Sequence, residues 1–270
     1  MLPTEPSPAS APPATPAQKP LAVWLAGTIR WADYLAMSER LVGEVAEPAG
    51  RNPSLVICEL EPCITIGRLG SRADVRLADA DLCSRRIPVA FTGRGGGAVL
   101  HGPGQVVVAM TSFLPDLGLR PHDVGGYLAR FQEAIASAIR AVRCGSAATH
   151  PAASGVFGRT GLLAAVGVAV RRGVACHGAF VNVCPAVDLH HRIDTLPPRI
   201  RQPGGESLPR IMGSLEADVQ RRVRLQDVRT ALVQSLGDAF AFPRTHINAG
   251  FPFKINAVAP HQPEVVSRVG

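Results

Sequence analysis

The sequence predicts an α/β (α+β) fold, in which helices flank a mixed β-sheet. Three segments, near residues 31–45, 124–142 and 225–239, carry apolar residues at the spacing of one buried helix face. Apolar, strand-like runs bounded by turn residues lie between them. Because several strands in succession separate the helices, the pattern favours a mixed sheet over a regular βαβ repeat.

Both ends of the chain have a different composition from the middle. Residues 1–20 contain seven prolines among Ala, Ser and Thr, so they predict a Pro/Ala-rich flexible tail. The folded domain is expected over residues 21–244. Beyond it the hydrophobic periodicity fades, and residues 245–270 are expected to form a C-terminal tail.

The first helix is predicted from its apolar face, formed by Trp31, Tyr34, Leu35, Ser38, Leu41, Val42 and Val45. Strands are then expected over residues 55–59, 63–67, 87–91 and 105–113. The second helix follows at 124–142. Asp123 is expected to be its N-cap and Gly145 its C-cap, because carboxylates cap helix starts and glycine suits a left-handed helix end.

The second half of the chain predicts a hairpin and a third helix. The turn residues 171–173 separate strands expected over 162–171 and 174–183. The third helix has an apolar face over 225–239. Asp227 lies in its first turn, where a carboxylate favours the helix dipole.

Composition excludes several classes of protein. Hydrophobic residues make up 46% and charged residues 18% of the 270, which is typical of a globular cytoplasmic protein. No apolar run reaches the ~18 residues of a membrane span, and residues 1–20 lack a signal-peptide pattern. We therefore expect a cytoplasmic protein with no membrane partner. We also expect a monomer.

The basic charge of the chain comes from arginine. Only Lys19 and Lys254 are lysines among the 28 basic residues, and the formal net charge is +7. Such a surface can attract an acidic partner, but biased codon usage is the favoured explanation. Basic runs and clustered aromatic residues are missing, so no nucleic-acid partner is expected.

The six cysteines form no C-x-x-C pair, which argues against a zinc ribbon. The adjacent residues His190 and His191 have no third ligand at a usual spacing and are expected on a solvated turn. We therefore predict no metal and no cofactor.

The most informative segment is 93–105, in which four glycines close to a strand precede a second turn. Glycines let the backbone approach a ligand closely and offer N–H groups to it. No Gly-Lys-Ser/Thr follows, which excludes a P-loop. A strand and not a helix follows, which excludes a dinucleotide fingerprint.

The whole string resembles the R-G-G-x-x-x-x-H-G-P-G-Q signature of the octanoyltransferases, members of the biotin/lipoate protein ligase superfamily. Further matches follow in order along the chain. Residues 59–62 and 65–68 resemble the family's E-H-P-P and T-L-G-R strings. Gly167 with 171–173, then His177, Gly178 and Asn182, and finally 214–215 resemble its S-L-G…R-R-G, H-G-x-x-x-N and T-S-L strings.

The resemblance implies a mixed sheet flanked by helices and an acyl-transfer activity. The family moves an octanoyl group from octanoyl-acyl carrier protein to a lysine of a lipoyl domain, as found in 2-oxoacid dehydrogenases or the glycine cleavage H protein. The resemblance carries acyl-binding positions over to Arg94, Gly95, Gly96, Gly97, Ala98, Val99, Leu100, His101, Ala165, Val166, Gly167, Gly178, Ala179 and Phe180.

This sequence departs from the family at the two positions that carry its covalent chemistry. The family's lysine, five residues before the matched Gly167, is Leu162 here, and its cysteine is Leu196. Leucine supplies neither a thiolate nor a cation. Cys184 or, less directly, Cys176 is the alternative nucleophile if a histidine activates it.

Two hypotheses follow. The chain is an acyltransferase that uses another nucleophile or no covalent intermediate, or it is a pseudoenzyme that binds acyl groups or lipoyl domains without transfer. Intact glycine-rich and histidine strings support both, and the absence of the lysine and cysteine favours the second on chemical grounds.

Overall fold

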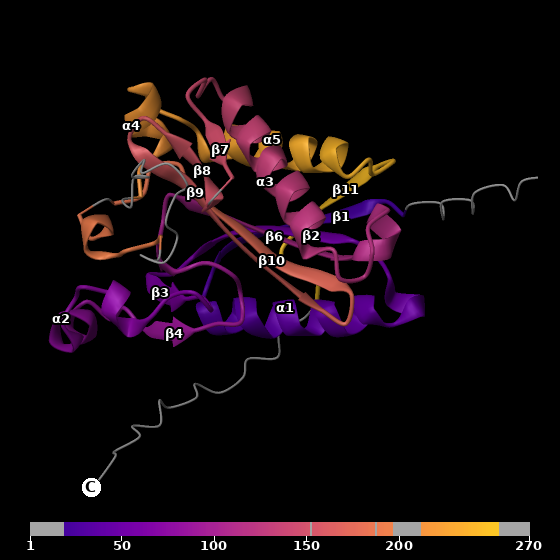
Figure 1. Cartoon of the computed structure of the whole chain (residues 1–270), viewed down its shortest axis with the longest axis horizontal. Coiled ribbons are helices and arrows are strands. Elements are labelled where there is room, and N and C mark those ends of the chain that lie inside the picture. Colours follow the sequence, from indigo (N-terminus) through magenta and orange to yellow (C-terminus); the bar gives the residue numbers. More distant parts are fainter. Residues whose placement is uncertain (1–18, 152, 187, 197–211, 254–270) are drawn as a thin grey trace, which may run out of the picture.

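The protein was analysed as a computed structural model that describes residues 19–151, 153–186, 188–196 and 212–253 (Figure 1). Within these residues the main element is an eight-stranded sheet. Its spatial order is β11 (Thr245–Ala249), β1 (Leu21–Ile29), β2 (Ser54–Leu60), β6 (Gln105–Phe113), β10 (Val174–Asn182), β9 (Gly161–Arg171), β8 (Ala153–Gly158) and β7 (Ala148–His150).

The sheet is mixed, as the sequence predicts. Strand β1 pairs in parallel with both β11 and β2, whereas the remaining pairs are antiparallel. Strand β11 lies in the segment expected to be a C-terminal tail, so the sheet extends past the expected boundary at residue 244. The Pro/Ala-rich tail predicted over 1–20 lies almost wholly outside the described residues.

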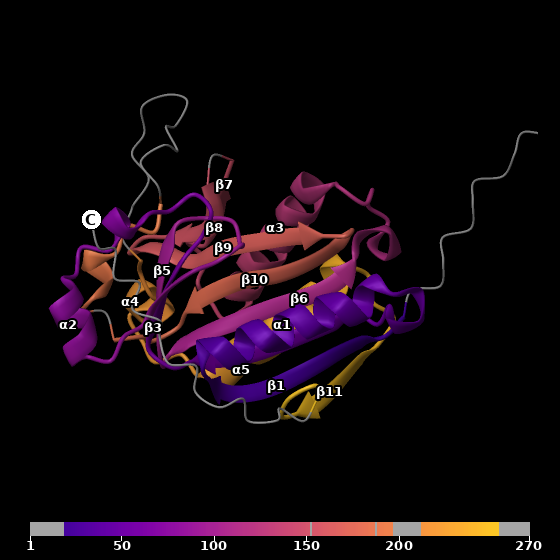
Figure 2. The ribbon, with the colours of Figure 1, turned by 90° about the horizontal axis from the view of Figure 1, so that it is seen from below.

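Helices cover both faces of this sheet (Figures 1 and 2). Helices α3 (Val124–Ala141) and α5 (Leu225–Ala239) pack on one face, and α1 (Trp31–Ala46) packs on the other. Strand β2 shows why both faces are apolar. Leu55 and Ile57 join the cluster under α3 and α5, whereas Val56 and Cys58 join the cluster under α1.

A second, three-stranded sheet lies beside the α1 face. Its order is β4 (Val89–Phe91), β3 (Cys63–Ile66) and β5 (Ala98–His101). The short helix α2 (Asp79–Ser84) contributes Leu82 to the apolar cluster of this sheet. Strand β5 lies inside the glycine-rich signature, so the small sheet and the main sheet hold that signature between them.

All three predicted long helices are confirmed, and so is the N-cap of α3, where Asp123 accepts a hydrogen bond from the Gly126 N–H at 2.8 Å. The predicted C-cap at Gly145 is wrong. Helix α3 ends at Ala141, and Arg143 takes the left-handed conformation with φ 68°. The chain turns this early because the buried Cys144 folds back and its N–H bonds to the Ile139 carbonyl.

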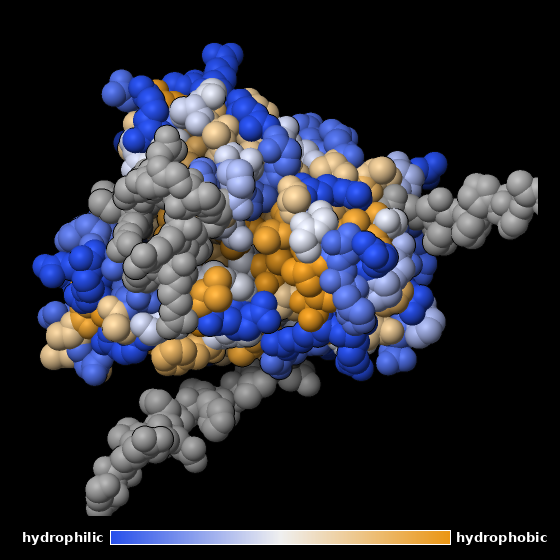
Figure 3. Space-filling model, in the orientation of Figure 1, coloured by the Kyte–Doolittle hydropathy of each residue, from blue (hydrophilic) through white to orange (hydrophobic). Residues whose placement is uncertain are grey.

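The predicted hairpin is confirmed. Strands β9 and β10 pair from Arg171 opposite Val174, and the two turn residues Arg172 and Gly173 have φ of 51° and 76°. Positive φ at both central residues is the geometry of the two-residue turn that matches the twist of the strands. In the view of Figure 3, hydrophobic residues lie at the surface over β9 and β10, between α3 and α1.

Two loops, between α3 and β7 and between β8 and β9, meet the short helix α4 (Leu215–Val219) at the buried carboxylate of Asp218. It accepts hydrogen bonds from the Thr160 N–H at 2.7 Å and the Thr160 hydroxyl at 3.0 Å, and also from Ser146 and Cys144. These bonds fix the segment that precedes α5. None of the described helices has both the length and the apolar character that a membrane crossing requires.

Candidate functional site

The glycine-rich loop of residues 93–97 lies along the open edge of β9. Strand β8 pairs with β9 only up to Ala165, and beyond that point the Gly95 N–H donates to the Val168 carbonyl at 3.0 Å. A Cβ on Gly167 would lie 2.6 Å from the Gly95 carbonyl oxygen. Glycine is therefore required at position 167 for this close approach of two backbones.

Arg94 holds this loop from the inside. Its side chain is 1% exposed and donates to the Thr65 hydroxyl at 2.7 Å, the Gly97 carbonyl at 3.1 Å and the Gly95 carbonyl at 2.9 Å. Burial lowers the pKa of Arg94 to about 10, so the guanidinium stays protonated at neutral pH. No carboxylate pairs with it within the described part of the chain, which leaves a buried, uncompensated positive charge.

A directed chain of hydrogen bonds begins at this guanidinium. The Thr65 hydroxyl lies 2.7 Å from His101 Nε2, and His101 Nδ1 lies 2.7 Å from Gln105 Oε1. An amide oxygen only accepts, so His101 carries its proton on Nδ1 and accepts from Thr65 through Nε2. Burial, and then the charge of Arg94, lower the pKa of His101 to about 3, which keeps this imidazole neutral.

The same chain continues into the main sheet. Gln105 Nε2 donates to Asn182 Oδ1 at 2.8 Å, and Asn182 Nδ2 donates to the Gly213 carbonyl at 3.0 Å. The side chains of Gln105 and Asn182 thus have protein hydrogen-bond partners. Gln105 connects the main sheet to the small sheet through His101. The signature strings supplied both residues, but nothing in the spacing showed that they form one network.

His177 occupies an unusual position in β10. Its φ is 61°, its side chain is buried, and its Nδ1 lies 3.2 Å from the hydroxyl of Tyr34 on α1. Burial, and then the charges of Arg94 and Arg171, lower the pKa of His177 to about 4. A left-handed residue within a strand is strained, and such strain is concentrated at functional sites.

Aromatic rings connect α1 with both sheets. Trp31 stacks on Tyr34 and on His101, and His101 meets the ring of Phe180 edge-on at 4.5 Å between centroids. The apolar spacing of the first helix had identified Trp31 and Tyr34 as core residues. The structure shows that they also carry α1 into the candidate site.

The structure brings together only part of the predicted acyl-binding set. Val99, Ala165 and Phe180 belong to the apolar cluster on the α1 face, and Arg94, Gly95, Gly167 and His101 adjoin it. The others lie elsewhere, and for Val166 and Ala179 the reason is that successive strand residues face opposite sides. Val166 and Ala179 join the cluster under α3, Gly178 faces Phe131 of α3, and Ala98 and Leu100 pack within the small sheet.

Leu162 and Leu196 also belong to the α1-face cluster, with Val99, Phe180 and Met212. Both are buried, and the backbone of Leu162 is bonded to the Gly213 N–H at 3.1 Å. The two family positions therefore remain close to the glycine-rich segment, but they contribute only hydrocarbon.

Among the described residues, neither Cys184 nor Cys176 has a hydrogen bond to an imidazole, so an alternative nucleophile at either position stays a prediction. Partial burial, then Glu216 and Glu59, raise the pKa of the Cys184 thiol, with Arg222 opposing. Burial raises the pKa of Cys176 to about 11. A protonated thiol is a poor nucleophile, so neither environment favours covalent catalysis.

The expectation for His190 is wrong. Its neighbour His191 is exposed, but His190 is buried in the short 3₁₀ helix His190–Arg192. Leu189 and Ile193 pack into the small-sheet cluster on either side and draw His190 inward. Within the described ranges, no group of His, Cys, Asp and Glu side chains is arranged to hold a metal ion.

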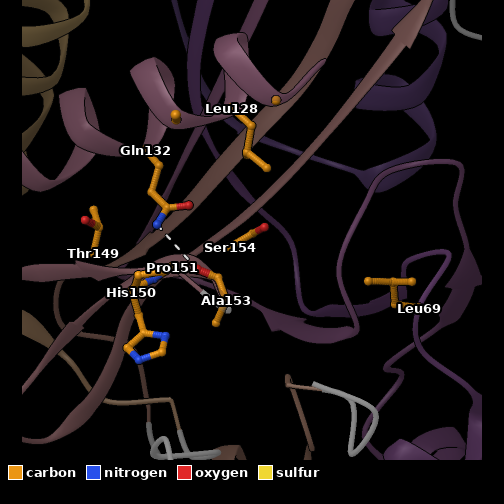
Figure 4. A pocket seen from close by; sticks show the side chains of 10 residues that line it. Leu69, Leu128, Gln132, Thr149, His150, Pro151, Ala153 and Ser154 are labelled. Atoms are coloured by element: carbon orange, nitrogen blue, oxygen red, sulfur yellow. Dashed lines mark hydrogen bonds between the residues drawn. The ribbon is translucent and has the colours of Figure 1, made fainter. Parts of the chain in front are cut away.

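A groove of about 690 Å³ opens beside the glycine-rich loop. Figure 4 shows Leu69 on one side, Leu128 and Gln132 of α3 on another, and Ala153 and Ser154 at the start of β8. The Leu69 N–H donates to the Gly96 carbonyl at 3.1 Å, which joins this wall directly to the loop.

Comparison with known proteins gives matches in sequence. Residues 31–237 match the lipoyl protein ligase A/B catalytic domain. An octanoyltransferase of Citrifermentans bemidjiense is 36% identical over 168 residues, which cover 62% of this chain and 76% of that protein. An octanoyltransferase of Nitrobacter winogradskyi is 32% identical over 214 residues, covering 76% of this chain and 83% of that protein.

Comparison with solved structures gives matches in fold. A bi-partite lipoate protein ligase from Thermoplasma acidophilum, described with its E2 lipoyl domain, superposes with a TM-score of 0.60. The match covers 86% of this chain and 87% of that one at 16% sequence identity. At such identity the likeness concerns the fold, and it agrees with the mixed sheet flanked by helices.

Proposed function

The chain belongs to the lipoyl protein ligase A/B catalytic-domain family, and we propose that it transfers an octanoyl or lipoyl group from acyl carrier protein to a lysine of a lipoyl domain. The observation that supports this is the intact glycine-rich loop, seated on the edge of β9 and held by the buried Arg94. We propose that the protein acts as a monomer and that the acceptors are lipoyl domains of 2-oxoacid dehydrogenases or the glycine cleavage H protein.

In this proposal the acyl chain binds among apolar residues of the α1-face cluster, near Val99, Ala165 and Phe180. The glycine-rich loop and His101 form the polar boundary of the site. Arg94 acts through the loop, because its guanidinium is already bonded to Thr65 and to the carbonyls of Gly95 and Gly97. Its uncompensated charge also favours the negative charge that develops on an acyl oxygen during transfer.

We propose that transfer proceeds without an acyl-enzyme. The unprotonated lysine nitrogen of the lipoyl domain attacks the thioester carbonyl, the C–N bond forms, and the C–S bond breaks. The thiolate leaves with the carrier and takes up the proton that the nitrogen loses. Leu196 supplies no sulfur and Leu162 no cation, so the rate comes from holding donor and acceptor together.

A second candidate function is favoured by the burial of Leu162 and Leu196 in hydrocarbon. A protein that keeps the acyl site but lacks the nucleophile can bind an acyl carrier or a lipoyl domain without turnover. The sequence comparisons favour transfer, and the chemistry at these two positions favours binding.

One experiment separates the two. The full chain is mixed with octanoyl-acyl carrier protein and a lipoyl domain, and the intact mass of the lipoyl domain is followed. Transfer adds an octanoyl group that a lipoyl domain with its acceptor lysine replaced by arginine does not gain. Binding of octanoyl-acyl carrier protein without any gain in mass supports the second candidate, and failure to bind or transfer excludes both.

A further inference from the structure

Two buried polar atoms in the segment from His190 to Leu196 have no hydrogen-bond partner among the described residues. They are Thr195 Oγ1 and His190 Nδ1, and each residue is 3% exposed. Leaving a buried polar group unpaired is costly, so native proteins pair almost all of them with protein, water or ligand. Two such atoms within one short segment therefore mark a place where a polar ligand atom belongs.

The segment that carries them is fixed at several points. Val75 and Ile193 form a β-bridge, and the Asp194 N–H donates to the Asp74 carbonyl at 2.8 Å. Ile193 packs in the small-sheet cluster, whereas Leu196 packs with Leu162 in the α1-face cluster. Thr195 thus stands between two anchored neighbours, at the junction of the small sheet and the acyl site.

His190 lies near the polar network of the site. A protonated His190 would lower the pKa of His101, so the two imidazoles lie within electrostatic reach of each other. Burial lowers the pKa of His190 itself, so its ring is neutral and its Nδ1 donates in one tautomer. The segment therefore offers a hydroxyl donor and a neutral imidazole next to hydrocarbon.

We infer that Thr195 and His190 form a polar subsite for the carbonyl oxygen of the acyl group, in a thioester or an amide. This inference rests on the proposed acyl-binding function and adds two residues to the acyl-binding positions that the resemblance implies. A carbonyl oxygen accepts from one or two donors and carries no charge, which suits this pair.

A carboxylate does not suit the subsite. Leu162 and Leu196 offer no cation, and the hydrogen bonds of Arg94 already go to Thr65 and to the backbone of the glycine-rich loop. An unpaired charge among apolar side chains is strongly disfavoured. The subsite therefore selects bound acyl groups against the free fatty acid.

Binding to the full-length protein tests this without turnover. Titration calorimetry compares S-octanoyl-pantetheine with the S-octyl thioether, which lacks the carbonyl. Thr195→Val, which removes the hydroxyl with little change of shape, is expected to weaken the thioester by about tenfold and leave the thioether unchanged. Thr195→Ser should restore most of the loss, and the exposed Thr230→Val is the matched control.

Two acyl ligands distinguish whether the subsite binds the carbonyl of the donor or that of the product. A peptide carrying Nε-octanoyl-lysine represents the product amide, and S-octanoyl-pantetheine represents the donor thioester. A Thr195→Val effect on both places the subsite at the carbonyl common to donor and product, whereas an effect on one assigns it to that ligand. Octanoate is expected to bind at least tenfold more weakly than the thioester.

The stability of the unliganded protein supplies a readout that does not depend on any acyl ligand. Replacing an unpaired hydroxyl by a methyl should raise the Tm of Thr195→Val by about 2–4 °C. A fall in Tm would mean that protein or water already satisfies Thr195, and would overturn the inference.

The binding outcomes separate this inference from the proposed function. Equal losses for thioester and thioether, or no loss for either, overturn the carbonyl subsite while leaving the acyl site intact. A wild-type protein that binds neither compound overturns the acyl-binding function and the subsite with it.

Discussion

Leu162 on β9 and Leu196, at the end of a segment anchored to the small sheet, are buried in the same apolar cluster. By the sequence resemblance, these positions correspond to the family's lysine and cysteine. The fold places both within one cluster, where neither side chain carries a titratable group.

Restoring both groups should restore covalent chemistry. The double variant Leu162→Lys, Leu196→Cys is expected to form an octanoyl thioester, since a cation beside a thiol favours the thiolate. Leu196→Cys alone should form much less, because burial keeps a lone thiol protonated. Cys58 and Cys63 of the same cluster show this effect, since burial raises the pKa of each to about 12.

The readout is the intact mass of each variant after mixing with octanoyl-acyl carrier protein, before and after hydroxylamine. Leu162→Lys alone is the control that supplies the cation without the thiol. Absence of adduct in a folded double variant would show that the two positions no longer face one another.

Arg94 should matter for stability more than an exposed arginine of the same region. Arg94→Lys cannot serve Thr65, Gly95 and Gly97 together, and is expected to lower the free energy of unfolding by about 3 kcal/mol. Arg68→Lys, at an exposed position beside the same loop, should change it by less than about 0.5 kcal/mol. Equal effects in urea unfolding would rule out the role of Arg94 as the support of the loop.

Asp218 should make the fold sensitive to acid. Burial raises the pKa of Asp218, but hydrogen bonds from Ser146, Thr160 and Cys144 outweigh this and lower it overall. A folded pKa below the unfolded value of ~3.9 gives stability that is complete above that pH and is lost as the pH falls through the folded pKa. Asp218→Asn should therefore be less stable than the wild type at pH 7, and the difference should shrink below about pH 4.

Urea unfolding at a series of pH values measures this difference, with the exposed Asp238→Asn as the control. A stability difference that stayed constant from pH 7 to pH 3 would show that the carboxylate charge contributes nothing.

The buried histidines predict a second pH dependence at higher pH. The pKa of His101 is lowered to about 3 and that of His177 to about 4, mainly by burial. Both lie below the unfolded value of ~6.5, so each histidine contributes stability that is complete above this pH. Between about pH 6 and pH 4 each should cost up to about 1.4 kcal/mol per pH unit as the unfolded state takes up protons.

NMR titration of the imidazole protons checks the two histidines directly. His101 and His177 should show no protonation between pH 8 and pH 5, whereas a titration near pH 6.5 in the folded state would contradict their burial. His122, which is exposed, provides a reference resonance in the same spectrum.

The parts of the fold that local chemistry determines could be predicted from the sequence. The faces of α1, α3 and α5 follow from apolar spacing, and the turn at Arg172 and Gly173 follows from its residues. Strand β11 could not, because its only described strand partner is β1, more than two hundred residues away in the chain. The short strands β7 and β8 were also missed, although their pairing is local, because β7 pairs with β8 and β8 pairs with β9 across a short turn.

In the site, too, the sequence predicted which residues take part but not how they contact one another. The signature strings identified Arg94 and His101, but not that Arg94 bonds to Thr65 and the loop backbone or that His101 is neutral. Gly178 and Ala179 were expected at the acyl group, yet Gly178 lies against Phe131 of α3 and Ala179 belongs to the cluster under α3. Alternation along β10 and the orphan atoms of Thr195 and His190 become visible only in three dimensions.

The central claim is that octanoyl transfer occurs directly from carrier to lysine in a site that lacks the family's nucleophile. A rapid-quench experiment with wild-type chain, octanoyl-acyl carrier protein and lipoyl domain tests it, with intact masses of all three proteins read at each time. The account predicts that the lipoyl domain gains the octanoyl group while this chain never carries a hydroxylamine-sensitive adduct. An adduct on this chain that forms and decays ahead of lipoyl-domain acylation, mapped to Cys184 or another cysteine, would contradict it.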